Sequence, residues 1–495
     1  MEKLKIVWSV KSECGPVRKK NEDSVYPVVS GSGFVPFKAG VFDGMGGHKK
    51  GEVASDLASS VMEKDYENLV SYVERANKEI YEYQENNKDS EGMGTTMTAI
   101  KIDEGGVLHV AHVGDSRCYV LSKRNLIKLT EDENVPGYQN VLLQALGTKK
   151  KLSIQTKDIK LFKGDVVLLC TDGLYNAAED LIERNLVAGR GDKTAVIDTN
   201  GAHTYADLHR RARRFANVLT DLGVQAEQRI ILCMHDTVAF PVCFLGAILA
   251  GVVPVPVNTR LTEKDYDYIL ADSRARVLVV SPDLLNTFEG LLDGHGNLNH
   301  VLVAGENTGS HQTLAALTDI APADFQAAAM KPDDMCFWLY TSGTTGMPKG
   351  AVHLHSHLIE TANLYAIPTL GINENDVVYS AAKLFFAYGP GNALTFPFAV
   401  GATAVLLEGP PMPSAVATIL KDHQPTIFFG VPTLFAMLLA GDDLPSQNDT
   451  NLRLCVSAGE ALPGELLIRW QERIGCDILD GLGSTEMLHI FLSNR

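Results

Sequence analysis

The sequence has little that suits a secreted, fibrous or membrane protein. Its eight cysteines stand singly with no C-x-x-C pair, so neither a disulfide framework nor a cysteine zinc site is indicated. Apolar residues make up 45% and charged residues 21% of the 495 residues, which excludes a disordered or collagen-like chain. The first ten residues carry charges within a short apolar run and show no cleavage site. We therefore expect a cytoplasmic location.

Positive charge is in short supply. The net charge of −16 argues against nucleic acid and anionic membrane as partners, because both bind a basic face. One apolar stretch, residues 240–257, could imitate a membrane span, but it contains Pro254 and Pro256. We interpret it as a helix, a turn and a buried strand, so no membrane partner is expected.

Lysine is almost missing from the second part of the chain. Residues 1–175 contain 20 Lys and 4 Arg, whereas residues 176–495 contain 6 Lys and 14 Arg. The net charge is −1 in the first part and −15 in the second. Such a change of composition is typical of two sequences of different origin, and it predicts two domains, residues 1–175 and 176–495.

The first part carries four acidic clusters, each beside or at the end of an apolar stretch. They are RKKNEDS with Asp23, VFDGMGG with Asp43, HVGDSRCYV with Asp115 and VVLLCTDGLY with Asp172. A single D-G is most often a plain turn. Four converging carboxylates favour hard cations such as Mg²⁺ or Mn²⁺, and two such ions activate water and bind phosphate. Arg18 lies in the first cluster and suits bidentate binding of a phosphoryl group.

These segments, together with GMGTTMTA (92–99) and LQALG (143–147), resemble the metal-dependent serine/threonine phosphatases of the PPM (type 2C) family. The resemblance implies a β-sandwich flanked by helices, two Mn²⁺ or Mg²⁺ ions and a phosphoprotein substrate. It implies that Asp43 and the carbonyl of Gly44 bridge the metals and that Asp23 and Asp172 complete their shells. It further implies that Asp115 belongs to a weaker third site and that Arg18 binds the substrate phosphate.

The last segment of that family, a D-N-x-T motif and a closing strand, does not occur here. GRGDKTAVI (189–197) offers Asp192 as a substitute ligand, but Lys193 replaces the asparagine and the spacing from Asp172 is short. We do not expect Asp192 to bind metal.

The second part has the pattern of a layered α/β domain. Residues 203–223 place apolar side chains at helical spacing and end at Gly223. Buried strands are expected at RIILCM (229–234), RVLVVS (276–281), NHVLVAG (299–305) and TIFFGVP (426–432), in a largely parallel sheet.

The polar loop YTSGTTGMPKG, residues 340–350, is the main chemical signal of this part. Its small residues let the backbone approach an anion, its hydroxyls donate, and Lys349 adds charge. It is not a Walker A loop, because Gly350 follows the lysine. SAGEALP (457–463) and DGLGSTEM (480–487) offer further groups to a nucleotide, with Glu486 as a Mg²⁺ ligand.

These motifs resemble the acyl-adenylate-forming superfamily, and KLFFAYGPGN (383–392) with GLGSTEMLHIFLSNR (481–495) resembles its benzoate-CoA ligases. The resemblance implies Mg²⁺-ATP and CoA as cofactors and a benzoate-like aryl carboxylate as substrate. The implied phosphate-binding residues are Thr341, Ser342, Gly343, Thr344, Thr345, Gly346 and Lys349. The implied adenosine-binding residues are Gly459, Glu460, Ala461, Asp480, Gly481, Leu482, Gly483, Ser484 and Thr485. The implied aryl pocket consists of Ala387, Tyr388, Gly483, His489 and Ile490. Lys349 and Glu486 would act in catalysis.

His353, His355 and His357 imitate a metal cluster. We predict that they alternate along one strand, which would place them on one face without a ligand set, and we expect no zinc there.

Two hypotheses stay open. One is a fused phosphatase and aryl-CoA ligase with one or both activities. The other is a fusion of two incomplete domains, impaired in both activities or used only for binding. The sequence ends nine residues after Glu486, before the family's ribose-binding aspartate and catalytic lysine, so little or no benzoyl-CoA synthesis is expected, with weak binding of ATP or benzoate retained. Residues 176–198 bear on the choice between the two hypotheses, because both families require this segment as a helix and a strand and one strand cannot complete both sheets.

Overall fold

The computed structural model describes residues 4–12, 20–45, 50–122, 125–135, 138–171, 177–306, 309–328, 330, 332–341 and 347–494. The chain divides into two compact units, Met1–Leu174 and Tyr175–Arg495, called unit 1 and unit 2 below.

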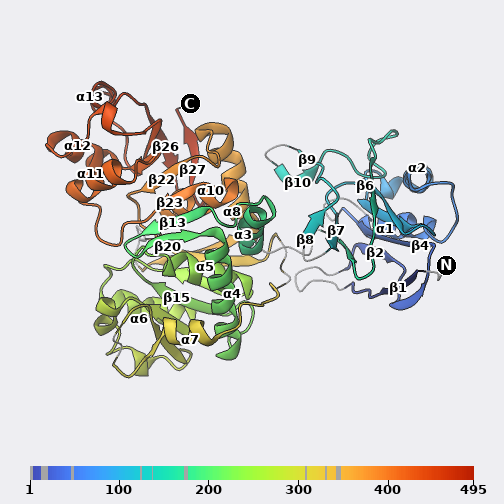
Figure 1. Ribbon diagram of the computed structural model, residues 1–495, viewed down its shortest axis with the longest axis horizontal. Helices are drawn as coiled ribbons and strands as arrows, with labels where there is room; N and C mark the ends of the chain where they lie inside the picture. The colour runs from blue at the N-terminus through green and yellow to red at the C-terminus, as the bar shows by residue number, and fades with distance from the viewer. Residues whose placement is uncertain are drawn as a thin grey trace. The chain divides into compact units, whose positions relative to one another are not determined.

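Unit 1 is an antiparallel β-sandwich with two helices on one face (Figure 1). A five-stranded sheet has the order β11-β6-β5-β4-β2, and a three-stranded sheet has the order β12-β7-β8. The strands are β1 (Lys5–Trp8), β2 (Asp23–Tyr26), β3 (Gly31–Phe34), β4 (Phe37–Asp43), β5 (Met97–Ile102), β6 (Val107–Val113), β7 (Arg117–Ser122), β8 (Asn125–Lys128), β9 (Asn134–Val135), β10 (Tyr138–Leu142), β11 (Gln155–Lys160) and β12 (Val166–Cys170). The helices are α1 (Gly51–Val61) and α2 (Leu69–Asn86).

Two apolar cores hold unit 1 together, because alternate residues of β5 and β6 face opposite sides of the sheet. Ile100, Leu108 and Val110 pack toward the three-stranded sheet. Ala99 and Ala111 pack with the buried faces of α1 and α2. The predicted β-sandwich flanked by helices is confirmed.

The apolar strand β12 is buried on one face only. Val166 is 56% and Leu168 is 42% exposed, whereas Val167 and Leu169 pack into the core between the sheets. An uninterrupted apolar run is therefore compatible with a strand that buries only one face. The described residues leave one face of β12 open.

Unit 2 contains two mainly parallel sheets. The larger has the order β14-β13-β23-β22-β24-β25-β26-β27, and the smaller has the order β16-β15-β17-β18-β19. The strands are β13 (Thr194–Asp198), β14 (Gly201–Thr204), β15 (Arg229–Cys233), β16 (Val253–Pro256), β17 (Val277–Val280), β18 (His300–Val303), β19 (Gln312–Thr313), β20 (Met335–Thr341), β21 (Lys349–Leu354), β22 (Val377–Ser380), β23 (Thr403–Val405), β24 (Ile427–Gly430), β25 (Leu454–Ala458), β26 (Ile478–Gly483) and β27 (Ile490–Ser493). β20 and β21 form a separate hairpin.

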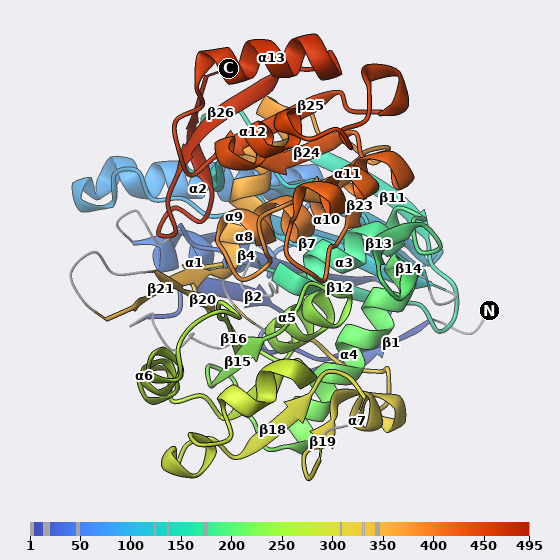
Figure 2. The ribbon, with the colours of Figure 1, turned by 90° about the vertical axis from the view of Figure 1, so that its left-hand side faces the viewer.

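Helices fill the space between the sheets and cover their outer faces (Figures 1 and 2). They are α3 (Ala177–Val187), α4 (Tyr205–Asp221), α5 (Ala239–Leu249), α6 (Glu263–Ser273), α7 (Leu314–Ile320), α8 (His355–Thr361), α9 (Tyr388–Pro390), α10 (Phe396–Val400), α11 (Pro413–Asp422), α12 (Pro432–Ala440) and α13 (Gly464–Ile474), with π-helical turns at Ala362–Leu370 and Gly391–Thr395. Ile230 of β15 and Phe429 of β24 join the central core with α3, α4 and α5. The neighbouring Ile231 and Phe428 face the outer cores instead.

The sequence-based prediction of a layered α/β domain is confirmed. The helix expected at 203–223 is α4, whose N-cap Thr204 accepts a hydrogen bond from the Asp207 amide. Gly223 follows with φ +75°, a conformation that suits glycine. Residues 240–257 form α5 and the buried strand β16, as expected. Among the described residues, no helix combines the length and apolar character needed to cross a bilayer.

The helix and strand that both families require at 176–198 belong to unit 2. Leu181 and Ile182 of α3 are buried in the central core with α4 and α5. β13 pairs with β14 and, in parallel, with β23, so it lies inside the eight-stranded sheet. Lys193 donates to the carbonyls of Glu374 and Gly401, and Asp192 beside it is exposed in the same unit. Residues 177–198 of the junction therefore form part of the core and of the large sheet of unit 2.

If α3 is part of the core of unit 2, Leu181→Ala will lower the free energy of unfolding of unit 2 by about 2–5 kcal/mol, because it leaves a cavity at a fully buried site. Urea unfolding can be followed by tryptophan fluorescence in a Trp8→Phe background, since Trp338 and Trp470 both lie in unit 2. Val187→Ala at the exposed end of α3 serves as the control, with an expected change within about 0.5 kcal/mol. An unchanged unfolding transition in Leu181→Ala would contradict the assignment of α3.

Candidate active site

In unit 1, two of the predicted metal ligands lie side by side. β2 and β4 are antiparallel, and Asp23 is the direct partner of Asp43 in their register. Side chains of directly opposed residues share one face of the sheet at a Cβ separation of roughly 5 Å. The Thr171 hydroxyl, just beyond β12, donates to Asp23 Oδ2 at 2.8 Å. The described end of β12 therefore meets the Asp23–Asp43 pair.

The backbone of Asp43 and Gly44 is held firmly. The Asp43 carbonyl accepts hydrogen bonds from the Thr96 amide and the Thr95 hydroxyl, each at 2.9 Å. The Gly44 amide donates to the Glu22 carbonyl at 3.1 Å. A Cβ on Gly44 would lie 2.4 Å from the Gly51 carbonyl oxygen, so only glycine fits. These bonds give the Asp43–Gly44 corner one fixed geometry.

Asp115 lies in the turn between β6 and β7. The Ser116 hydroxyl beside it lies 2.7 Å from Thr96 Oγ1, which in turn accepts the Asp43 amide at 3.0 Å. Hydrogen bonds thus connect the Asp115 turn to the Asp43 corner. Arg18 and Asp172 lie outside the described residues.

Oxygen ligands of this kind fit a hard divalent cation, which would lower the pKa of a bound water when present. The described residues contain no group of three or more side chains that form a metal site. Asp23 and Asp43 are the two predicted ligands that the described residues place opposite each other.

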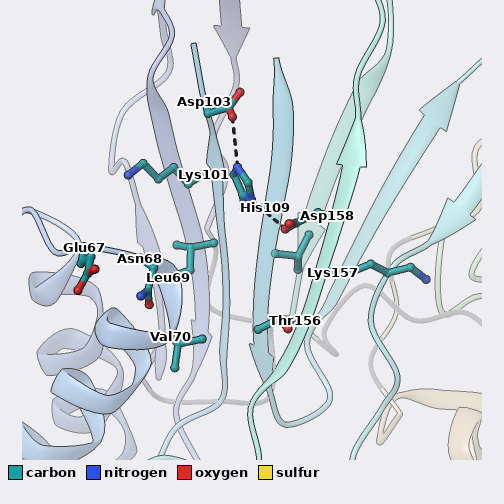
Figure 3. A pocket seen from close by; sticks show the side chains of 11 residues that line it. Glu67, Asn68, Leu69, Val70, Lys101, Asp103, His109, Thr156, Lys157 and Asp158 are labelled. Atoms are coloured by element: carbon teal, nitrogen blue, oxygen red, sulfur yellow. Dashed lines mark hydrogen bonds and ion pairs between the residues drawn. The ribbon is translucent and has the colours of Figure 1, made fainter. Parts of the chain in front are cut away.

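A hollow of about 460 Å³ lies elsewhere in unit 1 (Figure 3). His109 stands at its wall, with Nδ1 2.8 Å from Asp158 Oδ1 and Nε2 3.4 Å from Asp103 Oδ2. The predicted phosphatase residues that the structure describes, Asp23, Asp43, Gly44 and Asp115, do not line this hollow.

In unit 2, the described ends of the predicted phosphate loop face each other. Thr341 ends β20 and pairs directly with Lys349, which begins β21. Ser342, Gly343, Thr344, Thr345 and Gly346 lie outside the described residues. Burial lowers the pKa of His353 in β21 to about 4. The carboxylate of Glu486 lies close enough to His353 to oppose this fall in pKa. The hairpin that carries Lys349 therefore runs beside Glu486, which is exposed.

The two predicted adenosine segments follow neighbouring parallel strands. Ser457 of β25 pairs with Asp480 of β26, and Ala458 pairs with Gly481. Their carboxyl ends lie at the same edge of the sheet, where α/β folds commonly bind ligands. The structure thus brings Gly459, Glu460 and Ala461 close to Leu482, Gly483, Ser484 and Thr485. The Leu462 amide donates to Asp480 Oδ2 at 3.2 Å and connects the two segments.

The predicted aryl-pocket residues also converge near these strand ends. The Tyr388 hydroxyl donates to the Val456 carbonyl of β25 at 3.3 Å. Its ring lies 5.3 Å from the ring of His489, which is 3% exposed. Ile490 pairs with Gly483 across β26 and β27. Ala387 precedes α9 and packs against the central core.

Glycine makes this convergence sterically possible. A Cβ on Gly391 would lie 2.3 Å from the His489 ring, and a Cβ on Gly481 would lie 2.4 Å from the Ile490 side chain. A Cβ on Gly483 would lie 2.7 Å from the His489 carbonyl oxygen. Side chains at these positions would push β27 away.

Sequence reasoning missed the polar residues that hold these groups. Asn392 is fully buried, and its Oδ1 lies 2.9 Å from His489 Nε2. Asn392 Nδ2 donates to Ser380 Oγ at 3.3 Å. Asn392 stood in the quoted segment KLFFAYGPGN, where a polar residue within an apolar run was the available signal.

A second missed residue, Asp236, holds the start of that segment. It is 3% exposed, accepts the Leu384 amide at 3.3 Å, and lies 3.8 Å from Lys383 Nζ. Burial raises the pKa of Asp236 to about 6, and the nearby Lys383 opposes this rise. The pair anchors the turn that leads to Tyr388.

Three buried polar atoms near the strand ends have no hydrogen-bond partner among the described residues. They are Ser457 Oγ, Asp480 Oδ1 and His489 Nδ1. Buried polar atoms are nearly always paired, so such a group of exceptions indicates a ligand or water site.

The expected alternation of three histidines on one strand is wrong. β21 ends at Leu354 and α8 begins at His355, so only His353 lies on the strand. His353 Nδ1 lies 3.3 Å from His357 Nδ1, and His355 Nδ1 accepts the Ala177 amide at 3.2 Å.

The two-sheet architecture and the paired strand-end segments define unit 2 as an adenylate-forming fold. The family model described as AMP-binding enzyme matches residues 183–495. The chain belongs to this family.

Individual relatives support a narrower similarity. The chain is 58% identical over 322 residues to the benzoate–CoA ligase of Thauera aromatica, covering 65% of this chain and 61% of that protein. It is 45% identical to the 4-hydroxybenzoate–CoA/benzoate–CoA ligase of Rhodopseudomonas palustris, with coverages of 65% and 59%. A solved benzoate CoA ligase from Burkholderia xenovorans LB400 shares 51% identity at a TM-score of 0.62, with coverages of 65% and 63%. The chain spans about three fifths of the length of these relatives.

A second family model, stage II sporulation protein E (SpoIIE), matches residues 52–227. It confirms the resemblance of the N-terminal part to PPM-type phosphatases. The match extends into α3, β13 and α4, which the structure packs within unit 2.

The buried histidines predict how stability depends on pH. Burial lowers the pKa of His489 to about 3, and the nearby Tyr388 carbonyl only partly offsets this. An unfolded histidine has a pKa of about 6.5, so acidification from pH 7 to 5 protonates the unfolded chain first and lowers the free energy of unfolding. His489→Gln will reduce this loss by about 2 kcal/mol in urea unfolding at the two pH values.

The exposed His423→Gln is the matched control for that experiment and will leave the loss unchanged. An equal pH dependence in His489→Gln and the unsubstituted chain would show that His489 is not held neutral in the fold.

Proposed function

We propose that unit 2 binds ATP and a benzoate-like aryl carboxylate and forms an aryl adenylate with release of pyrophosphate. CoA would then displace AMP to give the thioester. The observation that carries this proposal is the convergence of Tyr388, His489 and Ile490 on the strand ends that present Asp480 to Thr485. The similarity to benzoate–CoA ligases supports the aryl acid as substrate.

The roles of individual residues follow from their surroundings. Thr341 and Lys349 would contact the phosphates, and Glu486 beside the same hairpin would hold Mg²⁺, which neutralises phosphate charge when bound. Asp480 Oδ1 is a buried acceptor without a described partner and suits the exocyclic amine of adenine. The aryl ring would pack against Ala387, Tyr388, Gly483, His489 and Ile490.

Calorimetric titration tests the aryl site. We expect benzoate to bind the intact chain, and Tyr388→Ala to weaken this binding about 10-fold or more, because a large apolar contact is lost. ATP affinity will change little, which shows that the variant is folded. Phe386→Ala is the control, since Phe386 is 49% exposed in the same segment. Equal benzoate affinity in Tyr388→Ala and Phe386→Ala would refute the aryl pocket.

We propose for unit 1 a metal-dependent phosphoester hydrolase site of the PPM type, acting on a phosphoprotein. The specific support is the direct pairing of Asp23 with Asp43 and the bond from Thr171 to Asp23. Asp172, Asp115, Arg18 and the Gly44 carbonyl would complete the site.

We further propose that the chain is a fusion of two sources joined near Tyr175 and that its phosphatase part is impaired. The support is the use of α3 and β13 by unit 2, since one strand cannot complete two sheets. Two fully active domains are the alternative outcome of the assay below.

Hydrolysis of p-nitrophenyl phosphate with Mn²⁺ tests this second function. We expect slow turnover that Asp43→Asn reduces at least about 10-fold, because a neutral amide is a poorer ligand for a hard cation. Asp158→Asn, at the hollow away from Asp43, is the control and will not change the rate. Turnover that survives Asp43→Asn would refute the two-metal assignment, and turnover typical of complete phosphatases would refute impairment.

A further inference from the structure

A chain of hydrogen bonds, buried at Asn392 and His489, fixes which His489 nitrogen carries the hydrogen. The first link is the Ala382 carbonyl, which can only accept, and the Ser380 hydroxyl donates to it at 3.2 Å. Ser380 Oγ therefore accepts a hydrogen bond from Asn392 Nδ2 at 3.3 Å. This orientation turns Asn392 Oδ1 toward His489 Nε2, 2.9 Å away.

Because Asn392 Oδ1 only accepts, His489 Nε2 must carry the hydrogen. The position of Gly391 agrees with this. A Cβ on Gly391 would lie 2.8 Å from Nε2, so the Nε2 edge of the ring faces the turn that begins at Tyr388. The backbone carbonyl of Tyr388 also lies near the imidazole. In the opposite amide orientation, Asn392 Oδ1 would face Ser380, whose hydroxyl would then donate to it and no longer to the Ala382 carbonyl. Asn392 Nδ2 would donate to His489 Nε2, and the ring hydrogen would sit on Nδ1 as a buried donor without a described partner.

His489 Nδ1 is then a bare acceptor. It is buried, and no described residue donates to it. An acceptor in this state costs about 1–3 kcal/mol unless a donor reaches it. Benzoate has no hydrogen-bond donor on its ring, whereas a hydroxyl or amino substituent supplies one.

We propose that Asn392 is a positioning residue that holds His489 as the Nε2–H tautomer, so that Nδ1 accepts a hydrogen bond from a ring hydroxyl or amino group of the aryl acid. This inference rests on the proposed aryl site and makes its preferred ligands hydroxy- or amino-substituted benzoates. Ser380 supports Asn392 from behind and does not touch the ligand.

The tautomer is measured directly by long-range ¹H–¹⁵N NMR of the full chain with ¹⁵N-labelled histidine. The His489 signal is assigned by its loss in His489→Gln. The expected pattern is that of a neutral ring protonated at Nε2. A ring protonated at Nδ1 would overturn the proposal, whether or not any aryl acid binds.

Ligand preference is measured by calorimetry with benzoate, 2-aminobenzoate and the three hydroxybenzoates. At least one substituted acid is expected to bind about 10-fold tighter than benzoate, the effect of one hydrogen bond to an otherwise unpaired acceptor. Asn392→Ala will remove most of this advantage while benzoate itself still binds. Thr395→Val changes a buried side chain in the same π-helical turn, whose hydroxyl donates to the Pro390 and Gly391 carbonyls among the described residues, and it will keep the advantage.

If Asn392→Ala does not fold, Ser380→Ala replaces it, with a smaller expected loss because Asn392 is still present. Equal affinity for benzoate and every substituted acid would overturn the proposal and leave the aryl site intact. Failure of all five acids to bind would instead refute the proposed function of unit 2. The NMR measurement would then test only whether Asn392 holds His489 as the Nε2–H tautomer.

Discussion

The close approach of β27 to β26 and to the Gly391 turn is the constraint on which the candidate site of unit 2 depends. Three glycines, Gly391, Gly481 and Gly483, leave out the Cβ atoms that would collide with His489 and Ile490. This lets an imidazole enter a space bounded by Tyr365, Tyr388 and Phe396. Burial then keeps that imidazole neutral, which makes it a hydrogen-bonding group and not a charge.

The second constraint acts at the junction. A helix and a strand can complete only one core, and here α3 and β13 complete the core and the large sheet of unit 2. The match of the SpoIIE model through residue 227 shows that sequence similarity alone assigns the same residues twice. Packing resolves this overlap, because Leu181 and Ile182 are fully or almost fully buried among α4 and α5.

Much of the fold followed from local patterns in the sequence. The amphipathic spacing of Leu208, Ala212 and Phe215 predicted α4, and apolar runs predicted the parallel strands. The register of β2 and β4 sets Asp23 opposite Asp43, two of the four carboxylates expected to converge. Local patterns failed where a neighbouring element decides the outcome. The open face of β12 left Leu168 exposed, and α8 began within the presumed histidine strand. The contact of Asn392 with His489 joins residues 97 positions apart, which no periodicity encodes.

Hydrogen–deuterium exchange of the full chain with and without saturating benzoate tests most directly whether the aryl acid binds where these elements meet. Slower exchange is expected in peptides that cover Tyr388–Thr395 and Gly481–Ser493, which come from separate parts of the sequence and adjoin only in the fold. Protection confined to other segments of unit 2, or found in unit 1, would contradict this account of the site.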